Sequence, residues 1–97
     1  MSTLVLLELQ LQSDKIADMK SYLAQVLPDT RSYDGCQGVD IYSNVDALGN
    51  MVAVERWESR GHYDKYLQWR TETGVGDKII SMLAEPPSFR YFERVDV

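Results

Sequence analysis

The sequence predicts an α+β fold of the ferredoxin-like type, with a four-stranded antiparallel sheet and both helices on one face. Strand-like and amphipathic segments follow each other in the order β-α-β-β-α-β, which is the split βαβ plan. The 97 residues, 44% of them apolar, are enough for one domain over residues 1–97. The first and last strands also carry apolar residues on both faces, so the sheet needs a cover on its second face too.

The first predicted strand, residues 4–12, alternates between two faces. One face is wholly apolar, with Val5, Leu7, Leu9 and Leu11. The other face starts with Leu4 and Leu6 before it becomes polar. The strand therefore has one side for the helices and a second side that is half apolar.

The first predicted helix starts after Ser13, a residue type that caps helices. Its apolar residues recur at helical spacing: Ile16, Met19, Leu23, Val26 and Leu27. We expect the helix to end at Pro28, because proline cannot donate to the helical ladder. Residues 28–38 are then a loop that leads to a second strand at residues 36–43, where Val39 and Ile41 face one way.

A hairpin connection over residues 44–50 leads into the central strand, which makes the second and third strands antiparallel neighbours. This third strand is apolar from Met51 to Val54 and then changes to Glu55, Arg56 and Trp57. Two charged side chains and a large indole thus lie at the C-terminal end of this strand. In a regular strand, Glu55 and Arg56 face opposite sides of the sheet.

The second helix is capped by Ser59 and closed by Gly74. One stripe of this helix holds Tyr63, Tyr66, Leu67 and Arg70, and His62 and Trp69 flank it. A short helical segment over residues 75–83 and the pair Pro86-Pro87 precede a final strand at residues 89–95.

Charge and motif content exclude several classes of function. The net charge is −5 and the basic residues are scattered, which argues against nucleic acids and anionic membrane surfaces. The longest apolar run is too short to span a membrane, and we expect a cytoplasmic protein. His62 is the only histidine and Cys36 the only cysteine, so we expect no metal site. The chain has no glycine-rich nucleotide fingerprint, and we expect no cofactor.

Two motifs carry a resemblance to a known family. Asp34-Gly35-Cys36 opens the second strand, and Val54-Glu55-Arg56-Trp57-Glu58-Ser59 leads into the aromatic helix. These stretches resemble the antibiotic biosynthesis monooxygenase (ABM) domain family, from Leu4 to about Tyr91. The resemblance implies a ferredoxin-like homodimer. Characterised members include cofactor-free monooxygenases of quinol-like polycyclic substrates, haem-degrading enzymes and an isomerase of a phosphorylated sugar.

The chain departs from its relatives at three positions. Tyr66 stands where many members carry a histidine, and Leu7 or a neighbouring leucine stands where haem-degrading members carry an asparagine. Ala53 replaces the asparagine found in enzymes of polyketide phenols, although the tyrosine of those enzymes is kept as Tyr63. The resemblance therefore argues against haem degradation and supports polyketide chemistry only in part.

A candidate site follows from the helical stripe. Tyr63, Tyr66 and Arg70 share one face, and Trp57 lies just before the helix, so the four can reach one volume between helix and sheet. We expect Trp57, Tyr63 and Tyr66 in catalytic roles, and Arg70, His62 and Glu55 in substrate binding. Arg70 needs a partner, which is either a carboxylate such as Glu55 or an anionic substrate.

The function favoured by these residues is a cofactor-independent monooxygenase of a phenolic or quinol-like small molecule. One alternative is an isomerase or lyase of a small phosphorylated or oxidised metabolite, which would suit Arg70. Another is a dimeric ligand-binding module without catalysis. In each case a second copy of the chain, packed sheet to sheet, is the expected cover of the free face.

Overall fold

The computed structural model describes residues 2–97, and Met1, the first residue of the expected domain, lies outside them. The elements are β1 Thr3–Gln10, α1 Ile16–Arg31, β2 Cys36–Ser43, β3 Asn50–Trp57, α2 Arg60–Glu72, α3 Val75–Ser81 and β4 Ser88–Glu93. The strands pair antiparallel in the order β2-β3-β1-β4. This confirms the predicted α+β class, the element order and the four-stranded antiparallel sheet.

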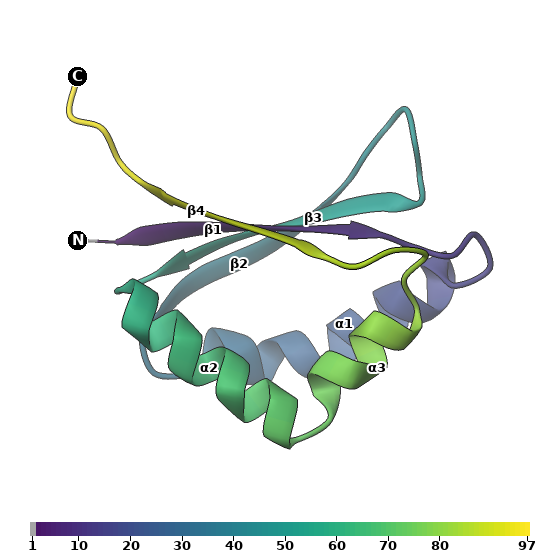
Figure 1. Cartoon of the computed structure of the whole chain (residues 1–97), viewed down its shortest axis with the longest axis horizontal. Coiled ribbons are helices and arrows are strands. Elements are labelled where there is room, and N and C mark those ends of the chain that lie inside the picture. Colours follow the sequence, from purple (N-terminus) through teal and green to yellow (C-terminus); the bar gives the residue numbers. More distant parts are fainter. Residues whose placement is uncertain (1) are drawn as a thin grey trace.

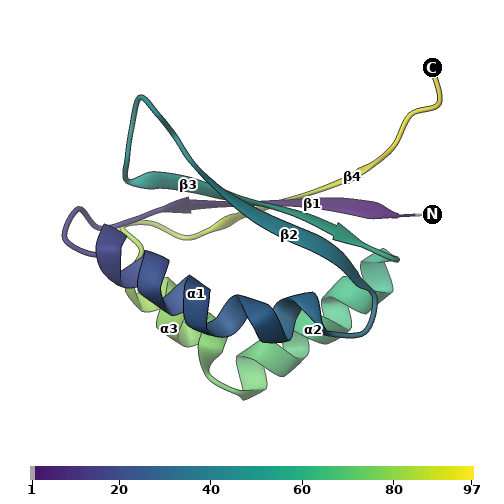
Figure 2. The same ribbon diagram turned by 180° about the vertical axis from the view of Figure 1, so that it is seen from behind.

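The molecule has two layers, the sheet and a layer of helices. All three helices lie on one face of the sheet, and the other face carries no helix in the described residues (Figure 1). The β2–β3 connection and the C-terminal segment both rise on the side away from the helices, as the view from behind also shows (Figure 2). None of the helices in residues 2–97 combines the length and apolar character that a membrane crossing requires.

The strand register decides which side chains meet the helices. Val5 of β1 pairs with Glu55 of β3 and Tyr91 of β4, and these residues face the helices. Leu4 pairs with Arg56 and Phe92 on the open face. Glu55 is buried and Arg56 is exposed, which confirms that the two face opposite sides.

Helix α1 differs from its prediction at both ends. Lys15 occupies the capping position without a side-chain cap, so the expected cap by Ser13 is wrong. The helix continues through Pro28, which is exposed, to Arg31. Tertiary contacts hold this last turn: the Arg31 guanidinium donates two hydrogen bonds to the Val39 carbonyl, of 3.2 and 2.9 Å. These contacts offset the hydrogen bond that Pro28 cannot make.

Helix α2 follows its prediction closely. The Ser59 hydroxyl accepts a hydrogen bond of 3.1 Å from the His62 backbone N–H, so Ser59 is the N-cap. Gly74 has a φ of 81°, the left-handed conformation of a glycine just past a helix end. The short segment after it is helix α3, as expected. Strand β4 ends at Glu93, two residues before the predicted end.

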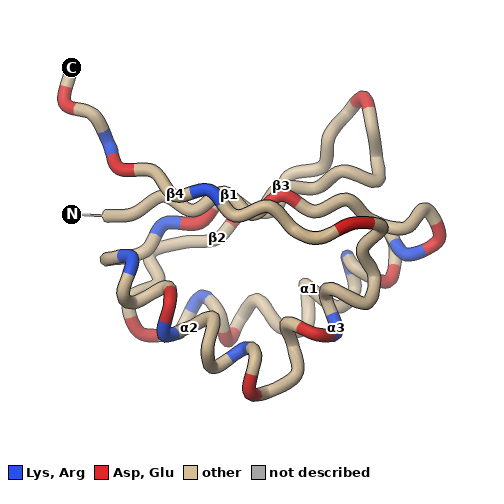
Figure 3. The backbone as a smooth tube through the Cα atoms, in the orientation of Figure 1, with Lys and Arg blue, Asp and Glu red and all other residues tan. Residues whose placement is uncertain are grey.

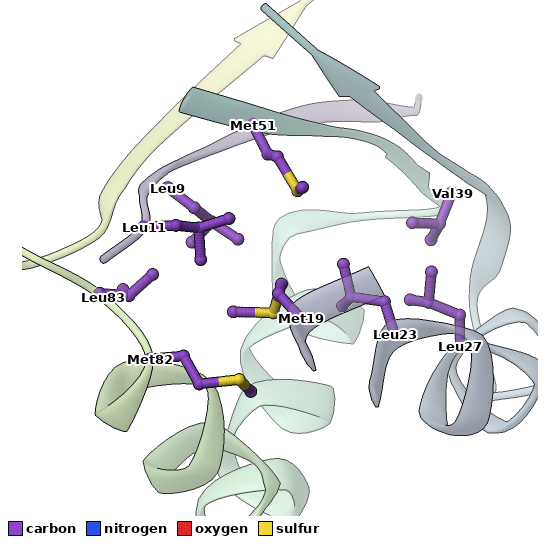
Figure 4. Close-up of a cluster of buried hydrophobic side chains, with 9 residues drawn as sticks. All are labelled: Leu9, Leu11, Met19, Leu23, Leu27, Val39, Met51, Met82 and Leu83. Atoms are coloured by element: carbon purple, nitrogen blue, oxygen red, sulfur yellow. The ribbon is translucent and has the colours of Figure 1, made fainter. Parts of the chain in front are cut away.

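Two clusters of buried side chains hold the layers together. The first is aliphatic and joins the sheet to α1 and to the end of α3; Figure 4 shows its members Leu9, Leu11, Met19, Leu23, Leu27, Val39, Met51, Met82 and Leu83. The second is mostly aromatic and contains Val5, Trp57, Tyr63 and Tyr66. Lysine and arginine residues are distributed over several elements and form no stripe on any of them (Figure 3).

Candidate active site

A cavity of about 150 Å³ lies between the sheet and the three helices. Members of both buried clusters contribute to its wall, which places the cavity between the two clusters. Most of the wall is aliphatic, and its polar side chains are those of Thr30, Glu55, Tyr63, Tyr66 and Arg70. Ile80 of α3 and Phe89 of β4 also line it and are 53% and 39% exposed, so the opening lies between these elements.

One polar wall of the cavity is a hydrogen-bonded network between α1 and α2. Arg70 Nε donates to the Tyr66 hydroxyl at 2.9 Å, and Arg70 Nη2 donates to Thr30 Oγ1 at 2.8 Å and to the Val26 carbonyl at 2.7 Å. The hydroxyls of Thr30 and Tyr66 are 2.6 Å apart. The network fixes the guanidinium at the inner surface of α2.

The charge of Arg70 is not neutralised by a neighbouring side chain. The residue is 5% exposed, and within residues 2–97 it forms no ion pair with a carboxylate. All its hydrogen-bond acceptors are neutral. A buried cation with only neutral acceptors favours an anion that enters the cavity. Of the two partners that the sequence leaves open for Arg70, the structure therefore disfavours Glu55.

Glu55 is the second buried charged residue in the wall. It is 4% exposed, and its Oε1 accepts a hydrogen bond of 3.1 Å from Trp57 Nε1. Burial raises the pKa of the Glu55 carboxyl to about 7, although the hydrogen bond from Trp57 acts in the opposite direction. A carboxyl group with this pKa is present in both protonation states near neutral pH.

Tyr63 is 1% exposed and lines the cavity next to Glu55. Burial, followed by the charge of Glu55, raises the pKa of the Tyr63 phenol. Burial also raises the pKa of Tyr66, against the hydrogen bonds from Thr30 and Arg70. Both tyrosines are therefore neutral at physiological pH. The Tyr66 hydroxyl is shared with Thr30 and Arg70, whereas the Tyr63 hydroxyl can donate to a bound ligand.

Trp57 does not line the cavity. It is fully buried at the helix side of β3, with its ring centroid 4.8 Å from that of Tyr66 and 5.4 Å from that of Tyr63. The indole therefore packs against the rings of the two tyrosines of α2. Trp57 is connected to the cavity wall by the hydrogen bond that its Nε1 donates to Glu55.

His62 also lies outside the cavity wall, in contrast to the predicted substrate-binding role. Its Nδ1 is 2.6 Å from the Ser59 hydroxyl, and its Nε2 is 3.4 Å from a Glu58 carboxylate oxygen. A Cβ atom on Gly35 would lie 2.5 Å from the imidazole ring, so the ring packs on this glycine. These contacts describe a histidine that supports the start of α2.

The structure thus brings Glu55, Tyr63, Tyr66 and Arg70 to one cavity and leaves Trp57 and His62 outside it. Sequence reasoning missed Thr30, which lies on the last turn of α1. The signal was present, because Thr30 continues the buried spacing of Met19, Leu23 and Leu27. It was obscured by the expected helix end at Pro28.

The polar groups of the cavity provide a proton acceptor in Glu55, a hydroxyl donor in Tyr63 and a cation in Arg70. Among the described residues, no three His, Cys, Asp or Glu side chains form a group that could hold a metal ion. The arrangement can bind a small, mainly apolar molecule with an acidic or hydroxyl group and can move a proton near neutral pH.

Comparison with known families and proteins agrees with this architecture. The sequence profile of the family described as antibiotic biosynthesis monooxygenase matches residues 3–71. The Mycobacterium tuberculosis protein Rv0793, whose name describes it provisionally as a monooxygenase, is 31% identical over 67 residues. That match covers 63% of this chain and 65% of the relative, so the match spans just under two thirds of the relative's length.

Solved structures with low sequence identity share the fold. The structure of Rv0793 from Mycobacterium tuberculosis superposes with a TM-score of 0.86 at 22% identity, covering 100% of this chain and 98% of that one. A conserved protein from Methanosarcina mazei Go1 gives a TM-score of 0.89 at 13% identity, covering 97% and 93%. At these identities the superpositions show a common fold.

Proposed function

This chain belongs to the antibiotic biosynthesis monooxygenase family, and from that membership we propose that it is a cofactor-independent monooxygenase of a small phenolic or quinol-like compound. The observation that carries the proposal is the largely apolar cavity with Glu55, Tyr63 and Arg70 in its wall. An apolar site with a few convergent polar groups is the usual form of a small-molecule site.

The size of the cavity favours a substrate with a single ring. Its volume is about 150 Å³, and an apolar cavity of about this volume is known to accommodate benzene. The opening at Ile80 and Phe89 leaves room for a substituent, but a fused polycyclic system would require the walls to move. We therefore propose an electron-rich monocyclic phenol or hydroquinone.

The proposed reaction needs no external reductant. One ring C–H carbon gains a hydroxyl oxygen from dioxygen, the two C–OH carbons of the hydroquinone become carbonyl carbons, and the second oxygen atom leaves as water. One hydroquinone and one dioxygen molecule thus give one hydroxyquinone and one water molecule, and the four electrons that reduce dioxygen come from the substrate. The protein's part is to exclude bulk water, accept a proton and hydrogen-bond the developing oxyanion.

The uncompensated charge of Arg70 favours one second candidate, an isomerase or lyase of a small phosphorylated or oxidised metabolite. Arginine binds phosphate and carboxylate groups in a fixed fork geometry. The guanidinium here is held by three neutral acceptors and has no acidic partner in the described residues. A tightly binding but non-catalytic module would use the same cavity.

We also propose that two copies of the chain pair through the open faces of their sheets. Tyr42 and Phe92 on that face are 56% and 42% exposed, and Leu4, Leu6 and Val54 are half-buried between them. The β2–β3 connection and the C-terminal segment flank the face (Figure 2). A second copy would bury this surface.

Oxygen uptake tests the proposed activity. We expect the protein to accelerate uptake above the background oxidation of monocyclic hydroquinones, and to incorporate one labelled oxygen atom from dioxygen into the product. The test variant is Ala53→Leu, which adds side-chain volume to the cavity wall and so reduces the space for a substrate. It should retain the fold and lose the acceleration. Uptake that is unchanged in this variant, or seen only with polycyclic quinols, contradicts the proposal.

A further inference from the structure

Glu55 is the one acidic side chain in the cavity wall among the described residues. Its Oε1 accepts the indole N–H of Trp57, and its Oε2 has no hydrogen-bond partner in residues 2–97. Every fully buried side-chain nitrogen and oxygen atom in those residues has a partner. Oε2 must therefore keep contact with open space, and the cavity is the open space that Glu55 lines.

The hydroxyl of Tyr63 is in the same situation. Its residue is 1% exposed and lines the cavity, and the hydroxyl has no partner in the described residues. Glu55 and Tyr63 thus line one largely apolar cavity, and Glu55 Oε2 and the Tyr63 hydroxyl have no hydrogen bond to each other or to another group in residues 2–97. Polar groups that reach a cavity and have no partner in the described residues are free to hydrogen-bond a ligand there.

We propose that Glu55 is the proton acceptor of this site, taking the proton of a ring hydroxyl through Oε2, and that Trp57 is the residue that positions it. This inference rests on the function proposed above. The O–H bond of the substrate breaks, an O–H bond forms on Glu55, and the electron pair stays on the substrate as a phenolate. The proton held by Glu55 is later returned to the oxygen atom that leaves as water.

The electrostatic surroundings of Glu55 fit an acceptor that works near neutral pH. From α2, Tyr63 and Tyr66 are close enough to sense its charge, and Arg70 is linked to Tyr66 by a hydrogen bond. From β2 the thiol of Cys36 is close enough to sense its charge, and α1 contributes the neutral Thr30 to the same wall. No ionisable side chain of α3 lines the cavity. The pKa of about 7 places the acceptor where general-base catalysis is most efficient.

The hydrogen bond from Trp57 gives the carboxyl group its orientation. It occupies Oε1 and leaves Oε2 toward the cavity. It also lowers the pKa of Glu55 against the larger effect of burial. The indole is fully buried, and it acts on a ligand only through this carboxyl group.

Binding of 4-methylphenol, measured by calorimetry, tests the inference without turnover. This probe has one ring and ionises only near about pH 10, as tyrosine does. A carboxylate accepts its hydroxyl proton in a stronger hydrogen bond than a neutral carboxyl group does. We expect binding to tighten about tenfold or more between about pH 5.5 and pH 8.5, with a midpoint near the pKa of Glu55. Toluene, which lacks the hydroxyl, should show no tightening.

Two variants separate the proposed role from a structural one. Glu55→Gln should bind 4-methylphenol with no dependence on pH and should keep a cooperative melting transition. Trp57→Phe should retain the dependence with its midpoint moved to higher pH, because the hydrogen bond that lowers the pKa is lost. A wild-type affinity that does not change with pH, or a dependence that persists in Glu55→Gln, overturns the proposal.

Oxygen uptake with hydroquinones distinguishes failure of this inference from failure of the proposed function. Glu55→Gln should lose the rise of kcat/KM with pH. If the wild type shows no uptake but 4-methylphenol binding responds to pH as expected, the monooxygenase function is wrong and the proton acceptor stands. If uptake by Glu55→Gln equals that of the wild type at every pH, the acceptor is wrong and the function stands.

Discussion

Arg70 Nε donates a hydrogen bond of 2.9 Å to the hydroxyl of Tyr66, which lies one helical turn earlier on α2. The same hydroxyl is 2.6 Å from Thr30 Oγ1 on α1. A single phenolic oxygen therefore links the cation of the cavity to the neighbouring helix. It is a buried hydrogen-bonding partner, and its removal has a predictable cost.

Replacing Tyr66 with phenylalanine should lower the free energy of unfolding by about 1–3 kcal/mol, because Arg70 and Thr30 each lose a partner at a buried position. Urea denaturation at neutral pH and equal protein concentration measures the change. Tyr22→Phe is the matched control, since the Tyr22 hydroxyl on α1 has no hydrogen-bond partner in residues 2–97. It should change the free energy by less than about 0.5 kcal/mol. Equal costs for the two variants would show that the Tyr66 network does not stabilise the fold.

Glu55 should make the protein less stable as the pH rises. Its pKa is about 7 in the folded protein and 4.5 as the ordinary value, so the unfolded chain releases the proton first. The stability due to this group is complete below about pH 4.5, falls as the pH rises and levels off above about pH 7. The pKa difference corresponds to about 3 kcal/mol.

The test of this linkage is the free energy of unfolding of Glu55→Gln relative to the wild type. We expect the advantage of the variant to grow by about 3 kcal/mol between about pH 4 and pH 8. The control Glu72→Gln, at the exposed end of α2, should follow the wild type at every pH. A constant difference between Glu55→Gln and the wild type would mean that the carboxyl group is solvated in the folded protein.

The fold was predictable because its strands obey a simple alternation. Val5, Leu9 and Val39 are apolar on the face that meets the helices, and each is buried there. The end of α1 was not predictable from local rules. Pro28 ends a helix in isolation, but here Arg31 anchors the following turn to the β2 backbone. Distant contacts of this kind leave no local signal in the sequence.

Part of the site was predictable because helical spacing, like strand alternation, is a local pattern in the sequence. Helical spacing brings Tyr63, Tyr66 and Arg70 together, and the structure places all three in the cavity wall. Spacing along the chain does not reveal that the Trp57 indole is buried and hydrogen-bonded to Glu55. It also does not reveal that the ring of His62 packs over Gly35. Both outcomes depend on packing between elements that are separate in the sequence.

The proposed dimer predicts a species of about twice the chain mass of 11.1 kDa in light scattering at micromolar concentration. Val54→Lys should shift this species toward the monomer, because Val54 pairs with Leu6 and Asp40 in the middle of the open face. Burying the lysine ammonium group between the two sheets removes its hydration, which is costly even with Asp40 beside it. Gln68→Lys, exposed on α2, adds the same charge away from that face and should leave the dimer intact. A stable wild-type monomer contradicts the proposal.

Arg70 should give the cavity a preference for ligands that carry a negative charge. We expect 4-hydroxybenzoate to raise the melting temperature of the wild type more than 4-methylphenol at equal concentration, because the carboxylate can pair with the buried guanidinium. Arg70→Gln should lose some stability, since Tyr66, Thr30 and the Val26 carbonyl lose hydrogen bonds. Each ligand shift is therefore measured against the variant's own melting temperature.

The informative quantity is the difference between the two ligands in each protein. In Arg70→Gln the advantage of 4-hydroxybenzoate should disappear while 4-methylphenol still stabilises, because the aliphatic wall is unchanged. Arg70→Lys should restore part of the advantage, since a lysine keeps the charge but not the fork. If a small phosphate ester protects the wild type and 4-hydroxybenzoate does not, the isomerase or lyase candidate gains over the monooxygenase. If neither anion is preferred over 4-methylphenol, the charge of Arg70 serves the α1–α2 contact alone.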